Sequence, residues 1–181
     1  MQAEEMVVLA DERGNRIGTA EKASVHTKST PLHLAFSCYL LNDAGELLIT
    51  RRALSKVAWP GVWTNSACGH LAPGETHVQA LQRRVPFELG LCPSELFDVT
   101  CVLPDFRYRA VDASGIVEWE ICPVFVARTS ADVQPEADEV AEFSWVVPEQ
   151  LVNAVDQAPF AFSPWMVEQL SHQDLRAALM N

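Results

Sequence analysis

Residues 69–91, GHLAPGETHVQALQRRVPFELGL, are the part of the chain that most constrains its fold. Pro73-Gly74-Glu75 is typical of a turn that opens a helix, and the residues that follow predict an amphipathic helix running to about Leu89. Gly90 supplies a C-terminal stop, because glycine adopts the left-handed backbone that ends many helices. The stretch therefore predicts a loop, a helix and a second loop.

The spacing of Gly69, Glu75 and Arg83 resembles the Nudix box, a loop-helix-loop that holds a divalent metal and a diphosphate. The resemblance covers about 69–91 and is partial, because Arg-Glu-apolar-x-Glu-Glu is replaced by Arg83-Arg84-Val85-Pro86-Phe87-Glu88. A metal that activates water for hydrolysis needs several oxygen ligands, and only one of the clustered carboxylates remains. We expect this helix to bind a diphosphate without hydrolysing it. An amphipathic helix with solvated arginines is the alternative.

Turn residues divide the rest of the chain into strands and helices. Glycines mark the turns of two predicted hairpins, 6–10 with 16–22 and 34–42 with 46–52. A third turn at 112–115 joins two long β-rich segments, 97–111 and 115–128. A further strand is predicted at 143–147, and two helices at 148–155 and 163–179. Ser163 and Pro164 are typical of the start of the last helix. The expected fold class is α+β, with a Nudix-like mixed and antiparallel sheet core flanked by helices, an N-terminal hairpin and a C-terminal helical extension.

The composition limits the kinds of partner. The 181 residues are 49% hydrophobic and 20% charged, with a formal net charge of −11, so we expect a globular protein without nucleic-acid or membrane partners. Most of that charge lies in 130–181, which we expect to lie outside any phosphate pocket. Five cysteines without C-x-x-C spacing, a start unlike a signal peptide and no long apolar run indicate a cytoplasmic protein.

Titratable residues outside the box form a candidate metal site. Glu118 and Glu120 are two residues apart in a β-rich segment, so both carboxylates are expected on one face, with Trp119 on the other. Two adjacent carboxylates repel each other, which raises one pKa or recruits a cation. The imidazoles would come from His26, His33 and His70. Mn²⁺, Mg²⁺ and Zn²⁺ all remain open, and scattered surface or core histidines are the alternative.

Six further motifs follow one another along the chain. They are Arg51-Arg-Ala-Leu-Ser-Lys56, Trp59-Pro-Gly-Val-Trp63, Thr64-Asn-Ser-Ala-Cys-Gly-His70, Phe106-Arg-Tyr-Arg109, Gly115-Ile-Val-Glu-Trp-Glu-Ile-Cys-Pro123 and Ser163-Pro-Trp165. Together they resemble type I isopentenyl diphosphate isomerases, most closely the enterobacterial members, over about 22–166. The resemblance implies one isomerase domain over 1–181 that reversibly converts isopentenyl diphosphate to dimethylallyl diphosphate through a tertiary carbocation. This is a step of isoprenoid biosynthesis, and the implied protein is a monomer or a homodimer.

The resemblance also implies roles for individual residues. Cys68 and Glu120 face opposite sides of the alkene, where one protonates the double bond and the other removes a proton from the adjacent carbon. Tyr108 assists Glu120, and the indole of Trp165 stabilises the cation. The five implied metal ligands are His26, His33, His70, Glu118 and Glu120. No flavin or NAD is implied, and without the resemblance Trp165 would be interpreted as core packing.

For the diphosphate we nominate Lys22, Arg52, Lys56 and Arg84. The planar guanidinium of arginine matches phosphate oxygens, and Mg²⁺ held by Glu88 and the carbonyl of Cys68 would bridge the phosphates. Solvated surface charge is the alternative for each cation. Pro86 removes a helix hydrogen bond, and a kink there could re-aim Glu88.

Two other functions compete with the isomerase. A Nudix-type diphosphohydrolase is disfavoured because Arg84 and Phe87 stand where carboxylates belong. A binding domain without catalysis is disfavoured by the combination of Cys68, Glu118 and Glu120.

Overall fold

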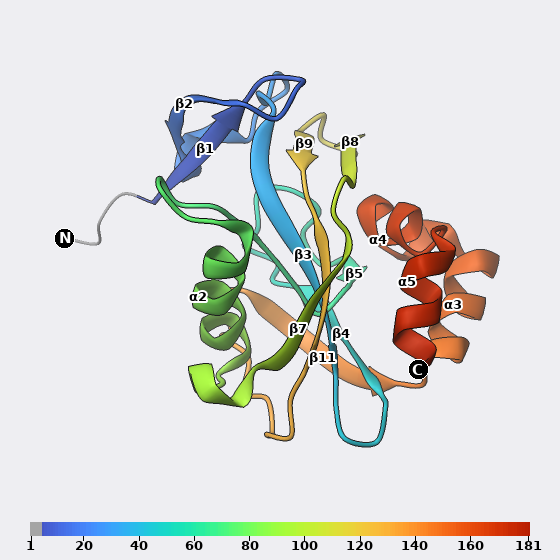
Figure 1. Ribbon diagram of the computed structural model, residues 1–181. Coiled ribbons are helices and arrows are strands. Elements are labelled where there is room, and N and C mark those ends of the chain that lie inside the picture. The colour runs from blue at the N-terminus through green and yellow to red at the C-terminus, as the bar shows by residue number, and fades with distance from the viewer. Residues whose placement is uncertain (1–4) are drawn as a thin grey trace.

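A computed structural model describes residues 5–181, which fold around one mixed sheet (Figure 1). The described strands are β1 (Met6–Ala10), β2 (Arg16–Glu21), β3 (His33–Leu41), β4 (Leu47–Arg52), β5 (Trp63–Thr64), β6 (Ala67–His70), β7 (Phe97–Leu103), β8 (Arg107–Val111), β9 (Val117–Ile121), β10 (Val124–Arg128) and β11 (Val140–Val146). The helices are α1 (Lys22–Val25), α2 (His77–Leu89), α3 (Pro148–Gln157), α4 (Pro164–Gln169) and α5 (Gln173–Met180), with short 3-10 turns η1 (Pro93–Glu95) and η2 (Pro159–Ala161). This arrangement confirms the α+β class and the N-terminal hairpin. Residues 1–4 of the predicted domain lie outside the described residues.

Strand β3 is the centre of the sheet. It runs antiparallel to β1, β4 and β6 and parallel to β9 and β10. The parallel register places His33 opposite Glu120, and the antiparallel register places Ser37 opposite Cys68. All nine residues of β3 are buried, so this strand fixes the positions of site residues on both of its neighbours.

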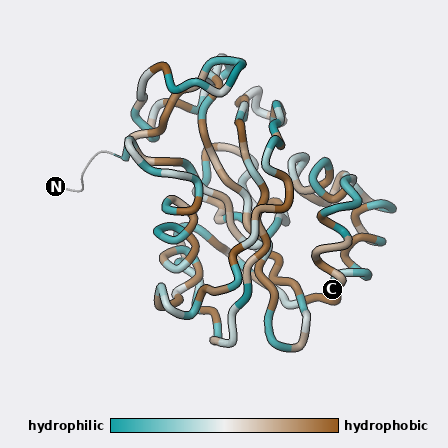
Figure 2. Tube along the Cα trace, viewed as in Figure 1, coloured by the Kyte–Doolittle hydropathy of each residue, from teal (hydrophilic) through white to brown (hydrophobic). Residues whose placement is uncertain are grey.

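The side chains of β3 alternate between two hydrophobic cores. Those that pack beneath α2 are Leu34, Phe36, Cys38 and Leu40. Those that pack beneath α3, α4 and α5 are Ala35, Tyr39 and Leu41. Figure 1 shows α2 on one side of the sheet and the three C-terminal helices on the other, and Figure 2 shows hydrophobic residues gathered along the strands between them. A strand covered on both faces reads as a continuous apolar run, as β3 does.

Helix α2 starts and ends at clear local signals. Thr76 and Gln79 form a capping box, so the helix begins after the predicted opening at 73–75. Gly90 ends it with φ 67°, where a Cβ would lie 2.2 Å from the carbonyl oxygen of Gln134. The helix continues through Pro86 to Leu89, and no break separates Pro86 from the turn that carries Glu88.

Three predicted segments are interrupted. The β-rich segments 97–111 and 115–128 each form two strands, because the chain turns near Pro104 and Pro123, which cannot donate a ladder hydrogen bond. The predicted helix 163–179 forms α4 and α5 with a break at 170–172. The Ser163 side chain accepts a hydrogen bond from the Met166 N–H, which supports its predicted place at the N-cap. Within 5–181, no helix has the length and apolar character that crossing a membrane requires.

Candidate active site

The five predicted metal ligands meet at one end of the central sheet. His26 follows α1, His33 begins β3, His70 ends β6, and Glu118 and Glu120 lie on β9. One ligand atom of each residue lies within 4.8 Å of those of the others. The two-residue alternation of β9 thus places both carboxylates beside the three imidazoles.

Buried polar atoms without partners show that this cluster fits a cation. Among the described residues, His26 Nε2, His33 Nε2 and Glu118 Oε2 are buried and accept or donate no hydrogen bond. His26 Nε2 nevertheless lies 3.2 Å from Glu118 Oε2, and His33 Nε2 lies 3.3 Å from Glu120 Oε1. His33 Nδ1 lies 2.9 Å from the carbonyl oxygen of Pro31, to which it can donate, so the lone pair of Nε2 is available to a metal. Burying such atoms unpaired costs free energy, and a divalent cation would remove that cost.

The environment separates the pKa values of the two carboxyls. Burial, followed by the charge of Glu120, raises the pKa of Glu118. Burial alone would also raise the pKa of Glu120, but the close imidazoles of His33 and His70 hold it well below its usual range. Burial lowers the pKa of His70 to about 4, so this imidazole is neutral near pH 7, as a metal ligand must be.

Cys68 lies on β6 at the wall of a cavity. Its Sγ lies 3.3 Å from Asn65 Oδ1 and 3.4 Å from Ser37 Oγ. Burial raises the pKa of the thiol to about 12 despite these two contacts, so the sulfur is protonated near pH 7. The next residue, Gly69, has no space for a side chain, because a Cβ there would lie 2.8 Å from the ring of Phe36.

Tyr108 and Trp165 form the aromatic part of the same wall. The Tyr108 hydroxyl donates to Glu120 Oε2 at 2.9 Å, which supports its predicted pairing with that carboxylate. Trp165 is 2% exposed and donates its indole N–H to Asn65 Oδ1 at 3.1 Å. The Arg52 guanidinium lies 5.5 Å from the centre of the indole ring. The ring is thus held in a dry position with a cation over its face.

One cavity of about 580 Å³ connects these groups, a volume typical of small-molecule sites. Its lining includes all the predicted catalytic residues, namely Cys68, Tyr108, Glu120 and Trp165. It includes all the predicted diphosphate contacts, namely Lys22, Arg52, Lys56, Arg84 and Glu88. Of the predicted metal ligands, His26, His70, Glu118 and Glu120 line it, and His33 is fully buried behind them.

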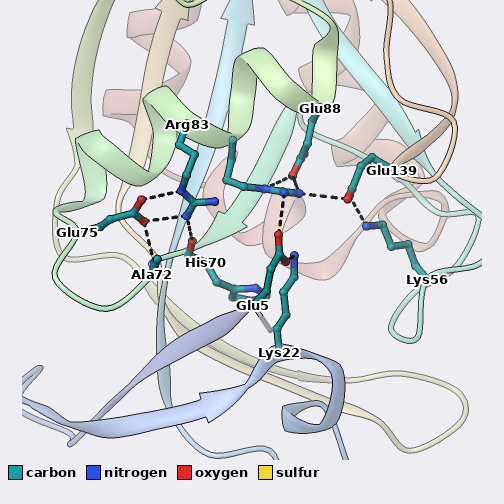
Figure 3. A network of polar contacts seen from close by, with 10 residues as sticks. Glu5, Lys22, Lys56, His70, Ala72, Glu75, Arg83, Glu88 and Glu139 are labelled. Carbon is teal, nitrogen blue, oxygen red and sulfur yellow. Dashed lines mark hydrogen bonds and ion pairs between the residues drawn. The ribbon is translucent and has the colours of Figure 1, made fainter. Parts of the chain in front are cut away.

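Carboxylates pair with most of the cations in this cavity. Arg84 donates to Glu88 Oε1 from Nε at 3.1 Å and from a terminal nitrogen at 2.6 Å. The same terminal nitrogen donates to Glu139 Oε1 at 3.1 Å, and Glu139 also accepts a hydrogen bond from Lys56. Figure 3 shows Glu88, Glu139 and Lys56 converging on this network.

Glu5 extends the network towards the N-terminal hairpin. It accepts a hydrogen bond from Lys22 at 2.5 Å and lies 3.5 Å from Arg84 (Figure 3). The hydrogen bond from Lys22 lowers the pKa of Glu5, so the carboxylate is charged near pH 7. Arg52 differs from the other cations, because it donates to the carbonyl oxygens of Ala58 and Trp59.

The position of Glu139 corrects one expectation. The acidic segment 130–181 was predicted to lie outside the phosphate pocket, but Glu139 lines the cavity between Lys56 and Arg84. It reaches the site because β11 pairs with β4, which brings 140–146 alongside the strand that carries Arg52. Sequence separation from Lys56 hides this contact, and no local motif indicates it.

Arg83 and Glu75, which lie in the Nudix-box segment 69–91, form contacts next to the cluster of candidate metal ligands. Arg83 donates to Glu75 from Nε at 2.6 Å and from a terminal nitrogen at 2.8 Å, and to the carbonyl oxygen of His70 at 3.2 Å (Figure 3). Glu75 accepts a further hydrogen bond from the Ala72 N–H at 2.8 Å. These contacts hold the loop before α2 against the end of β6, and they fix the backbone of His70, a candidate metal ligand.

Comparison with known proteins places this architecture in a family. The NUDIX domain family model matches residues 31–166. Among solved structures, DR0079 from Deinococcus radiodurans matches with a TM-score of 0.71 and 20% identity over 92% of this chain and 98% of that one. An Ap4A hydrolase from C. elegans matches with a TM-score of 0.54 and 22% identity over 80% and 96%. The chain belongs to the Nudix family, and its mixed sheet with flanking helices is the fold of these structures.

Curated relatives narrow the assignment. An isopentenyl-diphosphate Delta-isomerase of Corynebacterium diphtheriae is 65% identical over 97% of this chain and 96% of its own length. Another, from Agromyces mediolanus, is 64% identical over 91% of this chain and 79% of its own length. Within the Nudix family, the chain therefore belongs with the isopentenyl-diphosphate Delta-isomerases. The closer likeness to enterobacterial members stays a prediction.

Proposed function

We propose that this chain interconverts isopentenyl diphosphate and dimethylallyl diphosphate. One of Cys68 and Glu120 adds a proton to the double bond, and the other removes a proton from the carbon on the far side of the resulting cation. The proton gained and the proton lost balance, the double bond moves by one position and the diphosphate stays attached. The observation that carries this proposal is that both groups line one cavity whose lining also holds four cations.

The surroundings of the acid and base suit a carbocation. Water would convert the cation to an alcohol, and the groups around it expose little surface to solvent: Glu120 is 5%, Tyr108 8% and Trp165 2% exposed. The indole face of Trp165 stabilises positive charge, by about 2 kcal/mol or more when desolvated. Tyr108 donates to Glu120 and so steadies the carboxylate that exchanges a proton.

The Nudix family generally uses a divalent metal, and two positions are proposed for this chain. His26, His33, His70, Glu118 and Glu120 would hold Mn²⁺, Mg²⁺ or Zn²⁺, and the ion would supply positive charge that orients the Glu120 carboxylate. Glu88 and the carbonyl of Cys68 would hold Mg²⁺ together with the substrate diphosphate. Lys22, Arg52, Lys56 and Arg84 would bind the remaining phosphate oxygens. No flavin or NAD takes part.

A Nudix-type diphosphohydrolase fits the cavity less well. Hydrolysis needs a cluster of carboxylates for its metal, and the guanidinium of Arg84 occupies the space beside Glu88. That guanidinium is buried and bonded to Glu88 and Glu139, so this helix offers no cluster of free carboxylates that could hold a hydrolytic metal, and Glu88 would hold Mg²⁺ only with the help of the substrate's phosphates.

The wider organisation is also part of the proposal. Residues 1–181 act as one isomerase domain in the cytoplasm, as a monomer or a homodimer, with a small-molecule substrate and without nucleic-acid or membrane partners. The support is the net charge of −11 and five free cysteines.

Incubation with isopentenyl diphosphate and Mg²⁺ in D₂O tests the reaction. The isomerase predicts deuterium in the product and a new methyl signal in the proton NMR spectrum, with the diphosphate intact by phosphorus NMR. Release of phosphate or pyrophosphate without exchange would establish the hydrolase instead. Line broadening without any new product would indicate a binding domain.

A further inference from the structure

A chain of buried hydrogen bonds runs from the interior to Cys68. The Tyr39 hydroxyl donates to Gln169 Oε1 at 2.8 Å, and Gln169 Nε2 donates to Ser37 Oγ at 2.8 Å. Ser37 Oγ lies 3.4 Å from Cys68 Sγ and 3.4 Å from Cys122 Sγ. Tyr39, Ser37 and Gln169 have no exposed surface. None of the three lines the cavity, so the proposed reaction does not use them directly.

The order of donors and acceptors gives this chain a direction. A serine hydroxyl has one hydrogen to donate and two lone pairs that accept. The amide N–H of Gln169 occupies one lone pair of Ser37, so the Ser37 hydrogen is left for the two sulfurs, of which only Cys68 lines the cavity. The register between β3 and β6 sets Ser37 directly opposite Cys68, which aims the hydroxyl at the sulfur from the side of the core.

The second polar neighbour of Cys68 has its lone pairs occupied. Asn65 Oδ1 lies 3.1 Å from the indole nitrogen of Trp165, which can only donate, and 2.9 Å from the hydroxyl of Thr64. Ser163 Oγ accepts from the Met166 N–H and lies 2.8 Å from Thr64 Oγ1, so Ser163 can donate to Thr64 while Thr64 donates to Asn65. A carbonyl oxygen accepts two good hydrogen bonds, and these two donors supply both. The Cys68 thiol is a third donor to this oxygen, at the longer distance of 3.3 Å, so its hydrogen bond with Asn65 is the weakest of the three.

We propose that Ser37, held by Gln169 and Tyr39, is a positioning residue for Cys68. The Ser37 hydroxyl donates to Sγ from the core side and holds the sulfur at the cavity wall, where its S–H bond exchanges the weak contact with Asn65 for the bound substrate. Gln169 and Tyr39 act through Ser37, because the donated amide hydrogen keeps the Ser37 hydrogen on the side of the two sulfurs. This inference rests on the proposed role of Cys68 as a proton-transferring group.

The alternative is that the chain only stabilises the fold, since buried polar groups must be paired wherever they occur. The two roles differ in what they change. A structural role affects the melting temperature, whereas an aimed S–H bond affects the proton-transfer step once substrate is bound. Substrate binding is proposed to depend on Lys22, Arg52, Lys56 and Arg84, none of which hydrogen-bonds to Ser37, Gln169 or Tyr39.

The test compares kcat and KM for isopentenyl diphosphate in two deletions of single hydroxyls, Ser37→Ala and Tyr39→Phe, in the full chain with metal bound. We expect kcat to fall roughly tenfold in Ser37→Ala, which loses the hydrogen bond from Ser37 to Sγ. We expect it to fall about threefold in Tyr39→Phe, which keeps that hydrogen bond but leaves it less well ordered. KM and metal content should remain at the wild-type values. The matched control is Thr129→Val, which removes a fully buried hydroxyl that accepts from the Ala131 N–H. It should lower the melting temperature and leave kcat unchanged.

A folded Ser37→Ala protein whose kcat stays within about twofold of wild type would overturn the inference, and so would a rise in KM at unchanged kcat. If Ser37→Ala does not fold, Tyr39→Phe decides alone, and wild-type kcat in that variant overturns it. Cys68→Ala separates this inference from the proposed function. Full turnover in Cys68→Ala would remove the role of Cys68 itself, whereas an inactive Cys68→Ala beside a fully active Ser37→Ala would remove only the positioning role.

Discussion

The two ends of the cavity hold their charged groups in opposite ways. At the metal end, three imidazoles and two carboxylates converge, and several of their buried atoms have no hydrogen-bond partner among the described residues. At the diphosphate end, Lys22, Lys56 and Arg84 are each already paired with a carboxylate. The metal end thus has unpaired polar atoms that a cation can bind, whereas the cations of the diphosphate end are already neutralised by carboxylates of the protein.

This difference indicates how each end binds. Four of the five ligands at the metal end lie on β3 and its neighbours β6 and β9, so the strand register positions them before the ion arrives. The diphosphate end must exchange carboxylate contacts for phosphate contacts when substrate enters. Glu5 is the easiest to displace, because its side chain is 53% exposed, against 18% for Glu139 and 8% for Glu88. Metal binding and substrate binding should therefore respond differently to mutation and to salt.

The largest effect is expected from His33→Gln at the metal end. His33 has no exposed surface, and its Nδ1 contact with the Pro31 carbonyl fixes the ring, so glutamine cannot replace the Nε2 lone pair. We expect metal affinity to fall by more than about a hundredfold, because losing a ligand costs more than losing a residue that only hydrogen-bonds to a ligand. Turnover should fall with it. Metal content after gel filtration, measured by mass spectrometry beside kcat, checks this.

The control is His172→Gln, which changes an exposed histidine outside the cluster. It should bind metal and turn over like wild type. Retention of stoichiometric metal in His33→Gln would contradict the idea that this end is a preformed site.

A smaller effect is expected from Lys56→Met at the diphosphate end. The substitution removes one cation from the cavity and leaves Glu139 paired with Arg84 alone. We expect KM for isopentenyl diphosphate to rise about tenfold at nearly constant kcat, the loss of one charge-assisted hydrogen bond. Steady-state kinetics beside Lys28→Met, an exposed lysine away from the cavity, measures the difference. Equal KM values in the two variants would show that Lys56 does not contact the diphosphate.

The smallest effect is expected from Glu5→Gln, and its sign is opposite. Removing this carboxylate frees Lys22 and part of Arg84 from an internal competitor. KM should fall by about twofold to fivefold at low ionic strength, and the gain should shrink as salt screens the exposed pair. Glu12→Gln, an exposed acid outside the cavity lining, serves as control. A KM that rises in Glu5→Gln would show that Glu5 orders Lys22 rather than competes with substrate.

Local signals account for most of the fold that the sequence predicted. Turn glycines locate both N-terminal hairpins, and Gly90 locates the end of α2. The two long β-rich segments were predicted without their interruptions, although Pro104 and Pro123 are visible signals for them. The break between α4 and α5 has no glycine or proline to mark it, and residues of both helices are buried in the same core.

The site was predictable where a motif or a strand period carries it. Glu118 and Glu120 follow from the alternation of β9, and the placement of Cys68 and His70 from one short motif. Glu139 and Glu5 were missed because they reach the cavity only through the β4–β11 pairing and the N-terminal hairpin. Ser37 and Gln169 were missed because they do not line the cavity and because they are 132 residues apart in the sequence. Contacts of that kind exist only after folding.

The most direct test of the account is turnover of isopentenyl diphosphate by Cys68→Ala, measured together with its metal content. The side chain of Cys68 is not among the five candidate ligands, so the variant should bind metal like wild type. We expect a folded, metal-loaded protein without detectable isomerisation, because one of the two proton-transferring groups is gone. A Cys68→Ala protein that keeps most of its activity would show that Cys68 does not transfer a proton in this reaction.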